Sequence, residues 1–235
     1  MIENIGDTGT ASPMLDKIRK LLAKAEAEGV TPAERDALNA KAAEMAARHG
    51  INLAMAASSR PGSDELVLKE YEIGGDYRRE QATLMYYVLE GTGSKCVLTA
   101  MGLTAIGHQA DIERGEVLAT SLALQMASSV INECPSSAYT VRSGWMNGFA
   151  IAIRDRLAAS ETKARMEAEA QHGKDSVALV LQSREVAVKA AFAEEFPDVS
   201  HGRARRVDAG GYRAGQRATM GGTSVKRGSR GALAG

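Results

Sequence analysis

The residues most able to do chemistry in this sequence are basic side chains gathered toward its two ends. Residues 200–235 carry eight basic side chains and one acid, Asp208, so this segment has a net charge of +7 and the remainder −7. Residues 14–25 add four basic side chains against one acid, Asp16. Such side chains neutralise phosphate groups, which predicts non-specific contact with DNA or RNA. The predicted contact residues are Lys17, Arg19, Lys20, Lys24, Arg203, Arg205, Arg206, Arg213, Arg217, Lys226, Arg227 and Arg230.

The same charges fit two other interpretations. One is a solvated helix face with a solubilising tail, in which the charges contact water alone. The other is a tail that neutralises the acidic body of its own chain or of a neighbouring chain. The sequence leaves these alternatives open, because a charge pattern does not name its partner.

Patterns that specify catalysis or metal binding are missing from the sequence. The four histidines and two cysteines are scattered, and Gly91–Lys95 departs from the phosphate-loop pattern. We therefore expect no catalytic residue, no metal ligand and no cofactor. One enzyme hypothesis remains as the third choice, at His108, Asp111 and Glu113, because a strand end before a helix is a common place for site residues.

The basic residues near the N-terminus must be positioned by a helical hairpin over residues 14–51. Pro13 suits the first position of one helix, and Thr31, Pro32 and Glu34 form a capping box for a second. Gly50 predicts a left-handed end to that second helix. Apolar side chains at helical spacing indicate that the hairpin docks on the rest of the chain.

This hairpin resembles the N-terminal module of the domain-of-unknown-function 2786 family. The matching stretches are KIRKLLAKAE at 17–26 and AEMAARHGI at 43–51. Weaker similarity to the companion domain of such proteins extends to about Pro197 and includes GHQAD at 107–111. The family is frequent in actinobacteria and their phages, so the resemblance implies a phage-type accessory protein from that setting. It implies no catalytic residue.

The middle of the chain alternates short apolar runs with helical patterns. Strands are predicted at 66–73, 95–100, 103–107 and 177–181, and helices at 80–89, 111–132, 141–171 and 183–196. This order predicts an α+β fold: a helical hairpin, a small, mostly antiparallel sheet packed with helices, and a flexible basic tail. The expected segments are a leader (1–13), the hairpin module (14–53), a linker (54–65), the α+β domain (66–199) and the Gly/Arg-rich tail (200–235).

Composition bounds the setting of the protein. Residues 1–11 lack a hydrophobic stretch, and no apolar run approaches the roughly 20 residues that span a bilayer. Cys96 and Cys134 are expected to be reduced thiols, so we predict a cytoplasmic protein without membrane contact. An alternative function is a protein-interaction module that binds a host or phage protein through the acidic body or the Ala-rich hairpin. The sequence specifies no oligomeric state.

Overall fold

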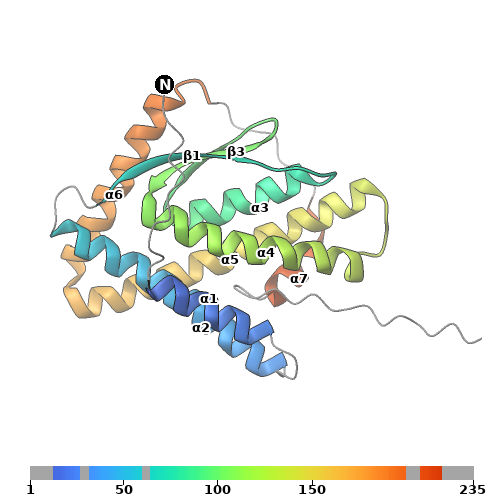
Figure 1. The fold of residues 1–235 in the computed structure, drawn as a ribbon, viewed down its shortest axis with the longest axis horizontal. Coiled ribbons are helices and arrows are strands. Elements are labelled where there is room, and N and C mark those ends of the chain that lie inside the picture. Colours follow the sequence, from blue (N-terminus) through green and yellow to red (C-terminus); the bar gives the residue numbers. More distant parts are fainter. Residues whose placement is uncertain (1–12, 27–31, 60–63, 200–206, 219–235) are drawn as a thin grey trace, which may run out of the picture.

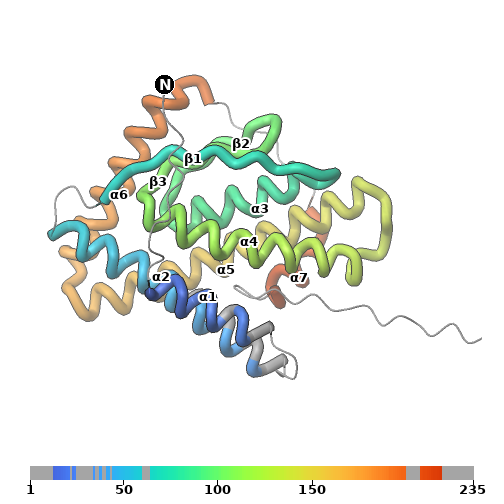
Figure 2. The backbone as a smooth tube through the Cα atoms, in the orientation of Figure 1, coloured from blue at the N-terminus to red at the C-terminus, as the bar shows by residue number. Residues whose placement is uncertain are grey.

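The computed structural model describes residues 13–26, 32–59, 64–199 and 207–218 (Figures 1 and 2). Within these ranges there are seven helices and a three-stranded antiparallel sheet, which confirms the predicted α+β class. The elements are α1 (Pro13–Glu26), α2 (Pro32–Ser58), β1 (Leu66–Glu72), α3 (Arg78–Gly91), β2 (Lys95–Leu98), β3 (Gly102–His108), α4 (Gln109–Glu133), α5 (Tyr139–His172), α6 (Lys174–Glu195) and α7 (Ala209–Arg217).

The predicted helical hairpin is present, with α1 and α2 side by side (Figure 1). Leu15 and Ile18 bury the apolar stripe of α1. The prediction that the second helix ends at Gly50 is wrong, because α2 continues to Ser58 through residues assigned to the linker. Its buried stripe also continues, since Ala47 and Ile51 pack against α5 and α6. Tertiary packing on this stripe outweighs the tendency of glycine to end a helix.

The sheet has the strand order β1-β3-β2, and both pairings are antiparallel. Leu66 lies opposite His108, and Lys95 lies opposite Ile106. The predicted strands near 66–73, 95–100 and 103–107 are therefore confirmed. β3 is the central strand, and all of its residues are buried. Leu103 and Ala105 pack with apolar residues of α3 and α4, so the sheet positions both helices.

One predicted strand is wrong. Residues 177–181 lie inside α6, and Ser183, predicted to cap a later helix, lies in its middle. A short apolar run fits a strand or a buried helix equally well, and here the packing decides. Val177 is buried in a cluster with residues of α2 and α5, because α6 packs against both of these helices. The predicted break before α6 is confirmed, because Gly173 adopts a φ of 85°.

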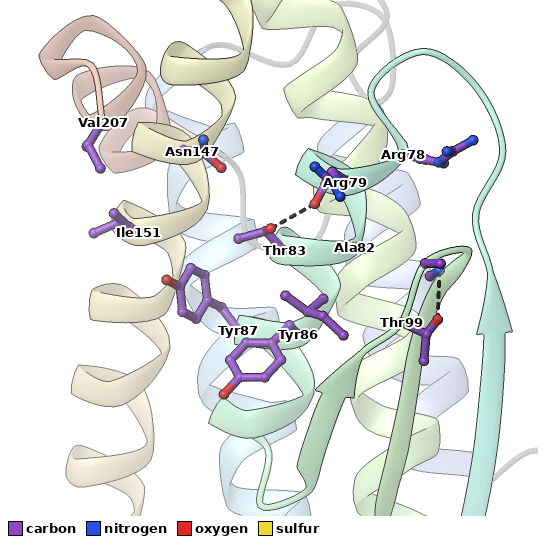
Figure 3. Close-up of a pocket in the computed structure, with 13 residues that line it drawn as sticks. Arg78, Arg79, Ala82, Thr83, Tyr86, Tyr87, Thr99, Asn147, Ile151 and Val207 are labelled. Carbon is purple, nitrogen blue, oxygen red and sulfur yellow. Dashed lines mark hydrogen bonds between the residues drawn. The ribbon is translucent and has the colours of Figure 1, made fainter. Parts of the chain in front are cut away.

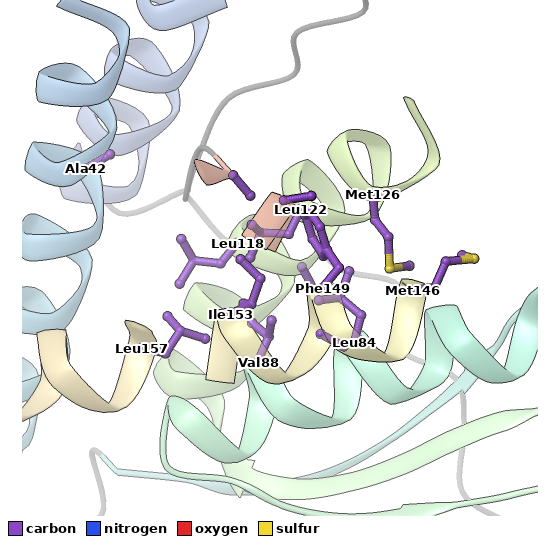
Figure 4. Close-up of a cluster of buried hydrophobic side chains, with 14 of the residues drawn as sticks. Ala42, Leu84, Val88, Leu118, Leu122, Met126, Met146, Phe149, Ile153 and Leu157 are labelled. Carbon is purple, nitrogen blue, oxygen red and sulfur yellow. The ribbon is translucent and has the colours of Figure 1, made fainter. Parts of the chain in front are cut away.

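The core lies where α3, α4 and α5 meet (Figure 4). Phe149, Ile153 and Leu157 form the predicted buried stripe of α5, and Trp145 stacks on Phe149 with ring centroids 5.9 Å apart. Leu84 and Val88 reach this stripe from α3, while Leu118 and Leu122 reach it from α4. This packing fixes α3 and α5 next to each other.

Residues 209–217 overturn part of the prediction that the tail is flexible. They form α7, which packs chiefly on α5. A side chain at Gly211 would overlap the Trp145 carbonyl, so this glycine allows the two backbones to approach. Asp208 caps the first turn through the N–H groups of Gly210 and Gly211, and the Arg156 guanidinium donates to the Gly215 carbonyl at 2.9 Å. This segment has few bulky apolar side chains, which is why the sequence suggested disorder. It docks instead through close contact between the backbones of α7 and α5.

Candidate functional site

The predicted basic residues divide into three groups. Lys17, Arg19, Lys20 and Lys24 are exposed on α1, where Arg19 pairs with Asp16 at 3.0 Å. Arg213 and Arg217 are exposed on α7, and Arg217 pairs with Glu133. The remaining predicted residues lie outside the described part of the chain: Arg203, Arg205, Arg206, Lys226, Arg227 and Arg230. The described members thus occupy two separate helices, and two of them are neutralised in part by acids of the same chain.

A groove that the sequence analysis missed lies between α3, the β2–β3 hairpin and α5 (Figure 3). Its volume is about 830 Å³, and Val207, just before α7, completes one wall. Two arginines and two tyrosines of α3 line it: Arg78, Arg79, Tyr86 and Tyr87. None of the described residues that line this groove is an acid. An anion entering it therefore meets positive charge without a carboxylate in the wall.

The two pairs of α3 side chains stand two helical turns apart. Figure 3 places the arginines near the start of α3 and the tyrosine rings further along it. Tyr86 and Tyr87 meet edge to face, with ring centroids 5.5 Å apart. The Arg154 guanidinium lies 5.5 Å from the centre of the Tyr87 ring. Burial and the nearby Glu90 raise the pKa of Tyr86 to about 12, so its phenol is neutral at physiological pH.

A second hollow, of about 250 Å³, lies among α2, α3, α4, α5 and α6. Arg114 is its central group, and its guanidinium is buried against the backbone of Gly50. It pairs with Asp111 at 3.1 Å and with Glu161, and it donates to the Thr92 carbonyl at 2.9 Å. Burial alone would lower the pKa of Arg114, but the two carboxylates raise it. The network joins the helical hairpin to the rest of the fold.

The residues of the enzyme hypothesis lie partly in this hollow. His108 is buried, and its Nδ1 is 2.9 Å from an Asp64 carboxylate oxygen. Arg184 connects Asp64 to Asp111, which it contacts at 2.6 Å. Glu113 does not line the hollow, and it accepts a hydrogen bond from Gln109. His108 and Asp111 are thus brought together by an ion-pair network, while Glu113 is not part of it.

The Cys96 thiol and the His49 imidazole are both held in their neutral forms by burial. Burial raises the pKa of the Cys96 thiol, which keeps it protonated, and Cys96 and Cys134 are both free. Burial and the neighbouring Arg114 lower the pKa of His49, which lies inside α2 next to Gly50. Across the described ranges, no cluster of three or more His, Cys, Asp or Glu side chains could hold a metal ion.

Some signal for the groove was present in the sequence. Arg79 precedes Tyr86 by seven positions, a spacing that brings these two side chains to one side of a helix. The opposite wall could not be inferred in this way. Thr99, Asn147 and Val207 come from segments far apart in the sequence, and only the fold brings them together.

Comparison with known proteins gives one match. The family model described as "Protein of unknown function (DUF2786)" matches residues 14–59, which supports the resemblance of the helical hairpin. No curated protein and no solved structure is significantly similar to the chain. In the ranges that the structure describes, no helix has the length and apolar character needed to cross a membrane.

Proposed function

We propose that this protein is a non-enzymatic accessory protein that associates with nucleic acid without reading its sequence. The groove carries the proposal, because arginines and tyrosines line it and its described wall contains no acid. Arginine and tyrosine side chains are the groups that contact phosphates and bases. Lys17, Lys20 and Lys24 on α1 add exposed positive charge. The setting that fits the family resemblance is the cytoplasm of an actinobacterial host or its phage.

A second observation supports the lack of catalysis. Asp111 and Glu161 in the 250 Å³ hollow, and Asp64 beside His108, are each engaged by an arginine. Carboxylates held in this way balance buried charge and keep the cations ionised. This arrangement suits a structural ion-pair network better than a proton-transfer site.

Binding to labelled oligonucleotides over a range of salt concentrations tests the proposal. We expect the logarithm of the binding constant to fall linearly with the logarithm of salt concentration, because bound phosphates release counterions. Changing Lys17, Lys20 and Lys24 together to Gln should weaken binding and flatten the slope. The matched control changes three exposed lysines of α5 and α6 to Gln: Lys163, Lys174 and Lys189. Failure of the intact protein to bind DNA or RNA at low salt would contradict the proposal.

A second candidate function is a protein-interaction module acting on a host or phage protein. Leu124 and Ile131 favour it, because they lie two turns apart on α4 with 47% and 67% of their surface exposed. Exposed apolar side chains that lie together on a surface are one of the marks of a protein-interaction site. Recovery of the same host protein by the intact chain, and its loss with Leu124→Lys and Ile131→Lys, would support this candidate. Unchanged recovery with both variants would contradict it.

A further inference from the structure

We propose that the groove beside α3 holds an unpaired nucleic-acid strand, with a base against the Tyr86–Tyr87 pair and a phosphate at Arg78 and Arg79. The inference rests on the proposed function and names its ligand class. The volume of about 830 Å³ lies within the range of roughly 300–1,000 Å³ typical of ligand pockets. The groove can therefore hold more than a phosphate group alone.

The charges of the groove select an anion. Arg78 is exposed and forms no ion pair within the described part of the chain, so its charge is available to a ligand. Arg79 lines the groove one position further along α3. The neutral Tyr86 phenol does not repel a phosphate, since its pKa lies far above physiological pH. The 250 Å³ hollow differs in this respect, because four acids line it: Glu90, Asp111, Glu161 and Glu185.

The tyrosines favour an unpaired strand over a duplex. An aromatic ring can stack on a base only where the face of that base is free, whereas bases in a duplex already stack on each other. Tyr86 and Tyr87 are partly buried in the core side of the groove, which holds their rings in place. A rigid ring loses little conformational freedom when a base packs on it. A duplex would leave this part of the groove unused.

The spacing of the two pairs also fits a strand. Arg78 and Tyr86 are separated by eight helical positions, or roughly 12 Å along α3 at about 1.5 Å per residue. Figure 3 shows the β2–β3 hairpin on one side of this path and α5 on the other. Val207 lies at the arginine end, and Arg203, Arg205 and Arg206 precede it in the sequence.

The test uses the full chain and fluorescence anisotropy with a labelled oligothymidylate of about 12 nucleotides, within the roughly 4–16 bound by known single-strand modules. Tyr86→Leu removes the ring, and Tyr86→Phe retains it. We expect Tyr86→Leu to weaken single-strand binding about 5- to 150-fold, the range for loss of one stacked base, and Tyr86→Phe to bind as the parent does. Binding of a duplex of equal length should change little in either variant.

Arg78→Ala tests the phosphate contact. We expect weaker single-strand binding and a salt slope smaller by about 0.7, the value for one phosphate contact on a single strand. The matched control is Arg165→Ala, an exposed arginine of α5 that pairs with Glu169. Circular dichroism and the fluorescence of Trp145, the single tryptophan of the chain, report whether each variant is folded. If Tyr86→Leu does not fold, Arg78→Ala decides whether the groove binds the strand, because substitution of an exposed side chain is not expected to unfold the protein.

Three outcomes separate the inference from the proposed function. Equal effects of these variants on single strands and duplexes would overturn the unpaired strand and leave nucleic-acid association standing. Binding of thymidine monophosphate as tightly as the oligonucleotide would overturn the strand in favour of a free nucleotide. Retention of full single-strand affinity in Tyr86→Leu and Arg78→Ala would exclude the groove, while no binding of any nucleic acid would remove both proposals.

Discussion

The two hollows of this molecule hold charge in opposite ways. In the hollow around Arg114, arginines and carboxylates pair with each other, and the central guanidinium is buried. In the groove beside α3, Arg78 is exposed and no described wall residue is an acid. A buried charge that is paired inside the fold cannot lose its partner without a large cost in stability, whereas a charge without an internal partner is available to a ligand. We therefore assign a structural role to the first hollow and propose that ligand binding occurs in the second.

The largest expected effect tests the structural half of this comparison. Arg114→Met removes the cation and leaves Asp111 and Glu161 without it, so we expect a loss of about 3–5 kcal/mol in the free energy of unfolding. Urea denaturation followed by circular dichroism measures it. Arg165→Met, which breaks an exposed pair with Glu169, should cost less than about 1 kcal/mol. Equal losses in the two variants would show that the Arg114 network does not stabilise the fold.

The next effect concerns the docking of α7, the helix that follows the groove residue Val207. Gly211→Ala places a methyl group where the Trp145 carbonyl lies, so α7 must move away from α5. We expect a loss of about 1–3 kcal/mol, as for overpacking of a tight contact, and a change in Trp145 fluorescence. Gln216→Ala, at an exposed position of the same helix, is the control and should leave the emission unchanged. An unaltered spectrum in Gly211→Ala would argue against the docking of α7.

A smaller effect is expected where the helical hairpin meets Arg114. A side chain at Gly50 would lie 2.7 Å from the Arg114 Cζ, and the guanidinium cannot move freely because its partners surround it. The cost of overpacking, about 1–3 kcal/mol, is offset by the roughly 1 kcal/mol that alanine gains over glycine in a helix. We therefore expect Gly50→Ala to destabilise the protein by about 1 kcal/mol in urea denaturation. Gly74→Ala, with open space around it, should not, and a stabilised Gly50→Ala would contradict the packing.

The smallest effect is a dependence of stability on pH through His49. Burial and Arg114 lower its pKa in the folded state, so below the ordinary histidine pKa of about 6.5 the unfolded chain binds the proton more readily. Its contribution to stability is complete above that pH and declines as the pH falls toward the folded pKa. Denaturation at about pH 7.5 and about pH 5.5 should show a smaller decrease in His49→Gln than in the parent. An identical decrease would assign the pH dependence to other groups.

The sequence predicted the elements whose patterns are local. The β2–β3 hairpin and the buried stripe of α5 follow from alternation and helical spacing, and both are present. The end of α2, the nature of residues 177–181 and the docking of α7 were wrong for one reason. In each case a contact with a distant element decides the structure: Ala47 and Ile51 on α5, Val177 on α2, and Gly211 on Trp145.

The candidate site, like the fold, could be predicted from the sequence only in part. Basic residues on α1 and in the tail are visible in the sequence as a charge pattern, yet that pattern cannot tell a solvated lysine from one that faces a partner. The groove needs the fold, because α3, the β2–β3 hairpin and α5 contribute to it from separated parts of the chain. Arg184 of the other hollow is likewise 120 positions from its partner Asp64.

Ultraviolet crosslinking of a bound single-stranded oligonucleotide, followed by tryptic digestion and mass spectrometry, tests the assignment of binding to the groove most directly. Trypsin releases residues 80–95 as one peptide that contains both Tyr86 and Tyr87. The crosslinked nucleotide is expected on this peptide, and an excess of unlabelled single strand should remove it while an equal excess of duplex should not. Crosslinks confined to peptides of α1, α6 or the C-terminal tail, with none on residues 80–95, would contradict the assignment.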